Sequence, residues 1–295
     1  MTQGTIIAHP RLVQRKRNIR PILRNNTLRR GLVMLGMLML VAFFASVITG
    51  IDPASVAPRV RLRPPSAAHW LGTDHLGRDV FSRLLYGSRV SLLVGLAVAT
   101  LAVLIGGFLG LISGVVRWID GLLMRAMDGV MAIPAIMFAI ALISGLGANL
   151  VTVCLAISIP EIPRVARLVR SVVLTVREEP YVEAAISMGT RPYALMFRHI
   201  LPNVVAPLIA QASYIASSAI LIEAALSFLG IGLPDEVPSW GNMMANARLY
   251  FHVQPGLMLF PGACIALTVY VINKIGDGLR DSLDPRVARS VGGLK

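Results

Sequence analysis

Three consecutive residues in a polar segment, Glu183, Ala184 and Ala185, have the side chains of a docking surface rather than of a catalytic centre. Alanine is so small that another surface can approach the backbone closely. The carboxylate of Glu183 offers a charge for a complementary partner. The chemistry that these residues favour is therefore the binding of another protein.

The residues around this triplet predict two short helices separated by a break. Pro180 suits the first turn of a helix, and the acids before it favour a helix N-terminus. Gly189 can adopt the left-handed conformation that ends a helix, and Thr190 can cap the next one, which Pro202 ends. Such an elbow between two membrane spans would tilt both when a bound partner rotates. An ordinary amphipathic connector is the alternative.

A further acid, Glu223, lies within an apolar run, where a charge costs about 2.5–3.5 kcal/mol on insertion scales. Two interpretations remain open. The side chain lines a translocation path or pairs across a subunit interface, or else it lies near the outer end of its span and is hydrated or neutral.

Other reactive residue types lack the spacing of a catalytic or metal site. The two cysteines, Cys154 and Cys264, lie in apolar runs and are expected to be packing residues. The segment from Gly72 to Gly77 contains no phosphate-binding G-x-x-x-x-G-K-[ST] sequence. The histidines show no ligand pattern; they are His9, His69, His75, His199 and His252. We expect no catalytic residue, metal or cofactor in this chain.

The composition places the chain in a membrane. Apolar residues make up 55% of its 295 positions and charged residues 15%, where soluble domains carry about a quarter. The net charge of +13 reflects orientation in the bilayer rather than nucleic-acid binding, because the arginines gather at the ends of apolar runs. The basic first 31 residues are too long for a signal peptide, so we expect a retained anchor.

Six apolar runs are long enough to cross a bilayer, which requires roughly 20 residues. They predict an all-α polytopic protein with helices at Leu32–Ile51, Val90–Val116, Val130–Gly147, Asn149 to at least Ile162, Val204–Ile231 and Gly256–Ile275. The fourth run is interrupted by Pro160, Glu161 and Pro163. In the second, Gly106, Gly107 and Gly110 form a small-residue face suited to close helix packing.

The basic residues predict the orientation of these spans. With both termini in the cytoplasm, 21 of the 28 Lys and Arg residues fall on the cytoplasmic side. The expected parts are a basic tail (1–31), the first helix (32–51), an extracytoplasmic segment (52–86), a five-helix transmembrane domain (87–280) with a cytoplasmic loop (178–203), and a second tail (281–295). Residues 79–86 either cover the pore mouth at the outer surface or simply lead into the second span.

Several motifs resemble those of one transporter family. The triplet at 183–185, Gly189 and the ending Ile200-Leu201-Pro202 resemble the EAA loop of ABC-type importer permeases. Other stretches are similar to the C-type permeases of dipeptide and oligopeptide importers: His69-Trp70-Leu71-Gly72-Thr73-Asp74, Gly77-Arg78-Asp79, Ser82-Arg83, Glu223-Ala224-Ala225-Leu226-Ser227-Phe228-Leu229-Gly230, Ser239-Trp240-Gly241 and residues 276–286. The chain is identified as a member of this subfamily.

The resemblance implies a type I ABC importer fold in a bacterial inner membrane. The implied partners are a homologous permease, two ATPase subunits that bind the ATP, an extracytoplasmic solute-binding protein and the lipid bilayer. The implied ATPase-coupling residues are Glu183, Ala184, Ala185, Gly189 and Pro202. No nucleic-acid partner is expected.

Short peptides are the expected cargo, and three alternatives stay open at this point. The same architecture imports nickel, glutathione or another small solute in related systems, and the cytoplasmic loop cannot discriminate among them because it faces the ATPase. An ion-coupled secondary transporter or channel would carry charges at mid-span and no docking loop. A membrane scaffold would have no role in uptake.

Overall fold

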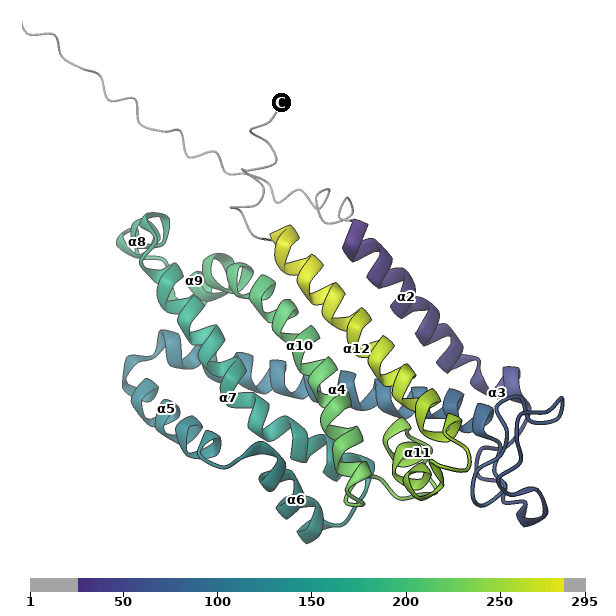
Figure 1. Cartoon of the computed structure of the whole chain (residues 1–295). Coiled ribbons are helices and arrows are strands. Elements are labelled where there is room, and N and C mark those ends of the chain that lie inside the picture. The colour runs from purple at the N-terminus through teal and green to yellow at the C-terminus, as the bar shows by residue number, and fades with distance from the viewer. Residues whose placement is uncertain (1–25, 284–295) are drawn as a thin grey trace, which may run out of the picture.

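A computed structural model describes residues 26–283, which are almost entirely helical (Figure 1). An isolated bridge between Thr73 and Asp79 is the one extended pairing in that range. The prediction of an all-α polytopic fold is confirmed. The two expected tails lie mostly outside the described residues.

The described residues form long helices joined by short ones. The long helices are α2 (Asn26–Phe43), α4 (Val80–Val115), α5 (Arg117–Met131), α6 (Ala135–Leu146), α7 (Leu150–Arg177), α10 (Leu201–Phe228) and α12 (Gly256–Leu283). The short elements are α3 (Ala45–Thr49), η1 (Pro58–Val60), α8 (Pro180–Ser187), α9 (Pro192–Leu195), η2 (Met196–Ile200), α11 (Trp240–Ala247) and η3 (Arg248–Tyr250). In Figure 1, α8 and α9 lie at one end of the bundle, and α3 and α11 lie at the other.

Four helical stretches in residues 26–283 are long and apolar enough to cross a membrane: Asn26–Phe43, Val80–Val115, Tyr193–Phe228 and Gly256–Ser282. A fifth candidate combines α5 and α6, which are bent by 82° at their junction. Helix α7 has 28 residues, about 42 Å, but it contains Glu161 and several arginines. Six spans therefore remain a prediction.

The expected third span, Val130–Gly147, is wrong as a continuous helix. Helix α5 ends at Met131, and α6 begins at Ala135 after Pro134. Proline has no N–H group and drives the residue before it away from the helical conformation, so the break falls at Ile133–Pro134. The 12 residues of α6 measure about 18 Å, too short to cross a hydrocarbon core of about 30 Å alone.

The prolines expected to interrupt the fourth span do not break it. Helix α7 continues through Pro160 and Pro163 to Arg177. Each proline removes one backbone donor, but contacts with a neighbouring helix can offset that loss. Among the helix pairs in the described part of the chain, α4 and α7 pack against each other most extensively.

The first and second spans differ from their expected limits. Helix α2 begins at Asn26 and ends at Phe43, and the short α3 follows before Gly50, whose φ is +58°. Helix α4 begins at Val80 and is capped by Asp79, whose carboxylate accepts a hydrogen bond from the Ser82 N–H at 2.7 Å. Residues 80–86 thus form the first turns of α4, and whether they also cover a pore mouth stays a prediction.

A row of glycines lets α4 approach α7 closely. Gly106, Gly110 and Gly114 recur every four residues and all face α7. A Cβ atom added to Gly106 would lie 2.6 Å from the carbonyl oxygen of Ile162, and one added to Gly110 would lie 2.7 Å from Cβ of Val169. These distances are shorter than real Cβ contacts, so the two helices meet nearly backbone to backbone.

The predicted small-residue face is only partly correct. Gly107 does not face α7: a Cβ atom there would lie 3.8 Å from Cδ1 of Leu208, an ordinary van der Waals contact. The row continues instead at Gly114, one turn beyond Gly110.

Replacing Gly110 by alanine should loosen the α4–α7 contact. We expect Gly110→Ala to destabilise the fold by about 1–3 kcal/mol, because the new methyl group must push the helices apart. Gly107→Ala is the matched control and should be neutral or slightly stabilising, since alanine is the better helix former. Thermal unfolding of the purified protein in detergent measures both. Equal effects at the two positions would contradict this packing.

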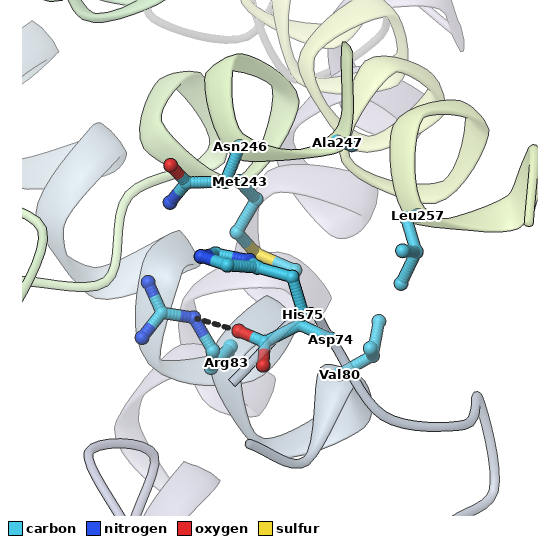
Figure 2. A pocket seen from close by; sticks show the side chains of 8 residues that line it. All are labelled: Asp74, His75, Val80, Arg83, Met243, Asn246, Ala247 and Leu257. Carbon is cyan, nitrogen blue, oxygen red and sulfur yellow. Dashed lines mark ion pairs between the residues drawn. The ribbon is translucent and has the colours of Figure 1, made fainter. Parts of the chain in front are cut away.

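Ion pairs join two distant loops at the α11 end of the bundle. The buried Arg78 donates from Nε to Oδ2 of Asp74 at 2.7 Å and from Nη1 to Oδ2 of Asp235 at 3.2 Å. The buried Arg83 donates to the backbone oxygen of Asp235 at 3.3 Å. Figure 2 shows Arg83 turned toward Asp74, with Asn246 of α11 nearby. The segment before α4 is thereby held against the loop that follows α10.

These neighbours also set the ionisation of Asp235. Burial raises the pKa of its carboxyl group, but a hydrogen bond from Asn246 and the charges of Arg78 and Arg83 outweigh burial, so the pKa lies below its ordinary value of 3.8. A carboxyl group whose pKa falls on folding stabilises the fold at pH values above its ordinary pKa. That stabilisation is lost as the pH drops through the lower, folded-state value.

Removing the charge of Asp235 should therefore have a pH-dependent cost. We expect Asp235→Asn to lower the unfolding temperature at neutral pH and the difference from the parent protein to shrink below about pH 3.8. The exposed neighbour Glu236 supplies the control, Glu236→Gln, which should change little. A difference for Asp235→Asn that stayed constant from neutral to acidic pH would rule out this role of the charge.

Candidate coupling surface

Helix α8 forms an elbow after α7, with both ends built as the sequence indicates. Pro180 occupies the first position of the helix. Gly189 has φ +77° and ends it, as predicted. The Gly189 N–H donates to the Ile186 carbonyl at 2.9 Å and the Thr190 N–H to the Ala185 carbonyl at 3.1 Å. This pair of bonds is the Schellman motif, which satisfies the last carbonyl groups of a helix.

The two faces of α8 have different environments. Val182 and Ala185 are buried against the core cluster that runs along α4, α7 and α10; Ala185 is only 3% exposed. Glu183 and Ala184 are exposed. The alanine pair is therefore divided: Ala184 offers a small side chain to the outside, and Ala185 lets α8 lie close to its own chain.

Large apolar side chains surround these exposed residues. Met188 is 79% exposed and Phe197 is 63% exposed. We define the coupling patch as the large exposed apolar residues of α8, its C-cap, α9 and η2, which are Tyr181, Ile186, Met188, Tyr193 and Phe197. Exposed charges border it; they are Glu183, Arg191 and Arg198. An apolar patch with a charged rim is typical of a protein–protein interface.

The second half of the elbow continues into α10 rather than ending. The chain is helical from Pro192 onward, passing through the π-helical η2 into α10. Pro202 lies in the first turn of α10, where a missing N–H group is tolerated, so the prediction that it ends a helix is wrong. Thr190 was expected to cap the second helix, but Arg191 is the residue that precedes α9.

Polar contacts connect the two arms of the elbow. The side-chain amide of Asn203 in α10 donates to the Tyr181 hydroxyl at 3.2 Å and to the His199 carbonyl at 2.6 Å. The rings of Tyr181 and His199 lie 6.2 Å apart. Helix α8, which directly follows α7, is thus also attached to the start of α10. A force on α8 acts on both long helices.

The structure brings the predicted coupling residues together, with Glu223 far from them. Residues 183–185 and Gly189 lie in the elbow, and Pro202 is the second residue of α10. Glu223 lies on α10 near its opposite end, and its side chain is fully buried within the chain, with 0% exposed. Its carboxylate accepts hydrogen bonds from Ser227 at 2.8 Å and Ser239 at 2.9 Å.

Sequence reasoning missed the apolar coupling patch. It weighed the charge and the small side chains of the elbow and did not consider large apolar residues there. The available signal was the presence of Met188, Tyr193 and Phe197 in a segment rich in charges and outside every expected span.

Comparison with family models identifies the wider group. Residues 102–289 match the model described as "Binding-protein-dependent transport system inner membrane component". The matched region contains the elbow, Glu223 and α11.

Individual relatives cover most of the chain. A protein of Sinorhizobium fredii named "Probable peptide ABC transporter permease protein y4tQ" is 50% identical over 88% of this chain and 91% of its own length. The dipeptide transport system permease protein DppC of Alkalihalophilus pseudofirmus is 45% identical over 87% and 85%. The glutathione transport system permease protein GsiD of Pectobacterium atrosepticum is 40% identical over 87% and 86%.

A solved structure shares the fold. A chain of the MetNI methionine ABC transporter, in an inward-facing conformation, matches with a TM-score of 0.55 over 68% of this chain and 96% of that chain, at 18% identity. The type I importer permease fold expected from the sequence is thus confirmed. With the family model and relatives up to 50% identical, the chain belongs to the family of inner membrane components of binding-protein-dependent transport systems.

Proposed function

We propose that this chain forms a translocation pore together with a homologous permease and that its coupling patch binds an ATPase subunit. The observation that carries this proposal is the exposed apolar patch on an elbow attached to both α7 and α10. Membrane permeases of this family work in ATP-driven transport, and a free apolar surface outside the spans requires a partner.

The proposal assigns a side of the membrane to each end of the bundle. Helix α8 faces the cytoplasm, in agreement with the predominance of Lys and Arg in the segments on that side. ATP is bound by two partner ATPase subunits, and this chain holds no cofactor. A solute-binding protein delivers cargo to the opposite end, near α11. Both termini are cytoplasmic.

Alternating access follows from the attachment of the elbow. When the ATPase subunits close on ATP, they displace α8. Because α8 follows α7 directly and its Tyr181 contacts Asn203 of α10, both helices tilt. The pore then opens at one end of the bundle and closes at the other. No step in this sequence requires a catalytic group on this chain.

Short peptides are the proposed cargo. The relatives at 50% and 45% identity carry names for peptide and dipeptide transport. Glutathione is the second candidate, since a relative at 40% identity is named for its transport. Uptake of a labelled dipeptide by membrane vesicles that contain the complete complex separates the two candidates. Only the true cargo class, added unlabelled at low concentration, should compete with the labelled dipeptide if that dipeptide is itself cargo.

Reversing the charge of Glu183 should weaken the binding of the ATPase subunit to this chain. We expect Glu183→Arg to reduce co-purification of the ATPase subunits and cargo uptake by about tenfold or more, since like charges facing each other in an interface cost several kcal/mol. The change should leave the fold intact because Glu183 is exposed. Affinity purification from membranes and vesicle uptake are the two measurements.

An exposed acid at the far end of the bundle provides the matched control. Glu236→Arg makes the same change of charge near α11 and should not affect retention of the ATPase. Full retention of the ATPase by Glu183→Arg, combined with full retention by Met188→Asp at the most exposed residue of the coupling patch, would refute the assignment of this surface.

A further inference from the structure

Glu223 connects two separate elements at the end of the bundle opposite the elbow. One of its hydrogen-bond donors, Ser227, lies on the same helix, α10, one turn further on. The other, Ser239, lies beyond the loop that follows α10. Both hydroxyl groups donate to the same oxygen, Oε1. The bond from Ser239 is therefore a direct side-chain link between α10 and the next helix, α11.

Ser239 is also the cap of α11. Its Oγ accepts a hydrogen bond from the Asn242 N–H at 3.2 Å, which satisfies a donor in the first turn. The same hydroxyl group donates to Glu223. One side chain thus both begins α11 and attaches it to α10, so the position of α11 depends on where Glu223 holds Ser239.

Close packing supports this attachment. Gly241 of α11 lies so near α10 that an added Cβ atom would be 2.7 Å from Cα of Ala224 and 2.9 Å from Cβ of Ser227. The buried Trp240 donates from its indole N–H to the Leu84 carbonyl of α4 at 3.0 Å. Helix α11 therefore lies directly against α10 and is also bonded to α4.

The helix that carries Glu223 begins in the coupling patch. Residues Tyr193–Phe228 form one continuous helical stretch of 36 residues, about 54 Å long. Tyr193 and Phe197 of the coupling patch lie at one end, and Glu223 lies at the other. Displacing the elbow must therefore move the helix that holds Ser239 and α11.

We propose that Glu223 is a positioning residue: by accepting the hydrogen bond of Ser239 it fixes α11 to α10, so that α11 follows α10 when the coupling patch is displaced. This inference rests on the proposed function, which supplies the displacement. Helix α11 is then the moving part at the far end of the pore. Glu223 acts as a hydrogen-bond acceptor, not as a charge that faces cargo or a partner subunit.

Two substitutions of Glu223 separate the acceptor from the charge. Glutamine keeps an oxygen that can accept both hydrogen bonds, so Glu223→Gln should retain cargo uptake within about twofold. Alanine removes the acceptor and leaves the Ser239 hydroxyl without its hydrogen bond to α10. Glu223→Ala should therefore reduce uptake per ATP hydrolysed by about tenfold. Loss of uptake in Glu223→Gln with the complex intact would overturn the proposal, since it would show that the charge is needed.

The two serines form a matched pair. Ser239→Ala removes the link between α10 and α11, and Ser227→Ala removes a hydrogen bond to the same oxygen from within α10. We expect Ser239→Ala to reproduce the lowered uptake per ATP and Ser227→Ala to leave it near that of the parent protein. Equal effects of the two would show that the link between the helices is not what matters.

The movement of α11 can be followed at Leu249, an exposed residue just after it. Cys154 and Cys264 are first replaced by alanine, and Leu249→Cys is labelled with a maleimide in the complex with its ATPase subunits, with and without a non-hydrolysable ATP analogue. The labelling rate should depend on the nucleotide in the parent background. That dependence should disappear in Glu223→Ala, while ATP hydrolysis continues.

The outcomes separate this inference from the proposed function. Two results would overturn only the role of Glu223 and α11. One is normal cargo import by Glu223→Ala. The other is a labelling rate at position 249 that does not change with the nucleotide in a complex that imports cargo. If the parent chain does not bind an ATPase at all, the proposed function fails before Glu223 is tested.

Discussion

Hydrocarbon offers no hydrogen-bond partner to a peptide group, and this constraint decides where the described chain can be irregular. Its longest non-helical stretch lies between α3 and α4, at the α11 end of the bundle (Figure 1). Buried side chains satisfy the backbone there: the Arg63 N–H donates to Thr73 Oγ1 and the Arg78 N–H to Asp74 Oδ1, both at 2.9 Å. The same Asp74 also holds the guanidinium group of Arg78. Polar side chains thus supply the backbone of this loop with hydrogen-bond partners. Where the surrounding side chains are apolar, the backbone must satisfy itself by forming a helix.

Within the helical part, small residues and side-chain links determine which helices are held together. The glycine row joins α4 to α7 nearly backbone to backbone. Helix α10 is attached to α8 at one end through Asn203 and to α11 at the other through Glu223. Packed helices of this kind shift as rigid bodies rather than bend gradually. In the proposed mechanism, a displacement of the elbow reaches α11 through the helical stretch Tyr193–Phe228, which is about 54 Å long.

Much of this arrangement could be predicted from the sequence, because it follows from local rules. Apolar run length indicated most of the spans, and Pro180 and Gly189 marked the ends of α8. Where tertiary contacts override local preference, the prediction was wrong: α7 continues through two prolines, and it packs on α4. Pro202 was misjudged for a local reason, because it lies in the first turn of α10, directly after the π-helical η2. The direction in which individual side chains point could also not be predicted from the sequence. The sequence does not reveal that Ala185 faces inward while Ala184 faces outward, or that Glu223 bonds to Ser239 across a loop.

Contact between the elbow and the ATPase can be measured by cross-linking at Ala184. Ala184 is exposed and small, so Ala184→Cys should be tolerated. In a chain without Cys154 and Cys264, and with single cysteines placed on the ATPase surface, a short bifunctional reagent should join position 184 to the ATPase in a nucleotide-dependent manner. The same reagent should not join Leu249→Cys. Absence of any cross-link at position 184 in a complex that imports cargo, or labelling of that cysteine by a reagent confined to the outside of the cell, would show that α8 does not bind the ATPase.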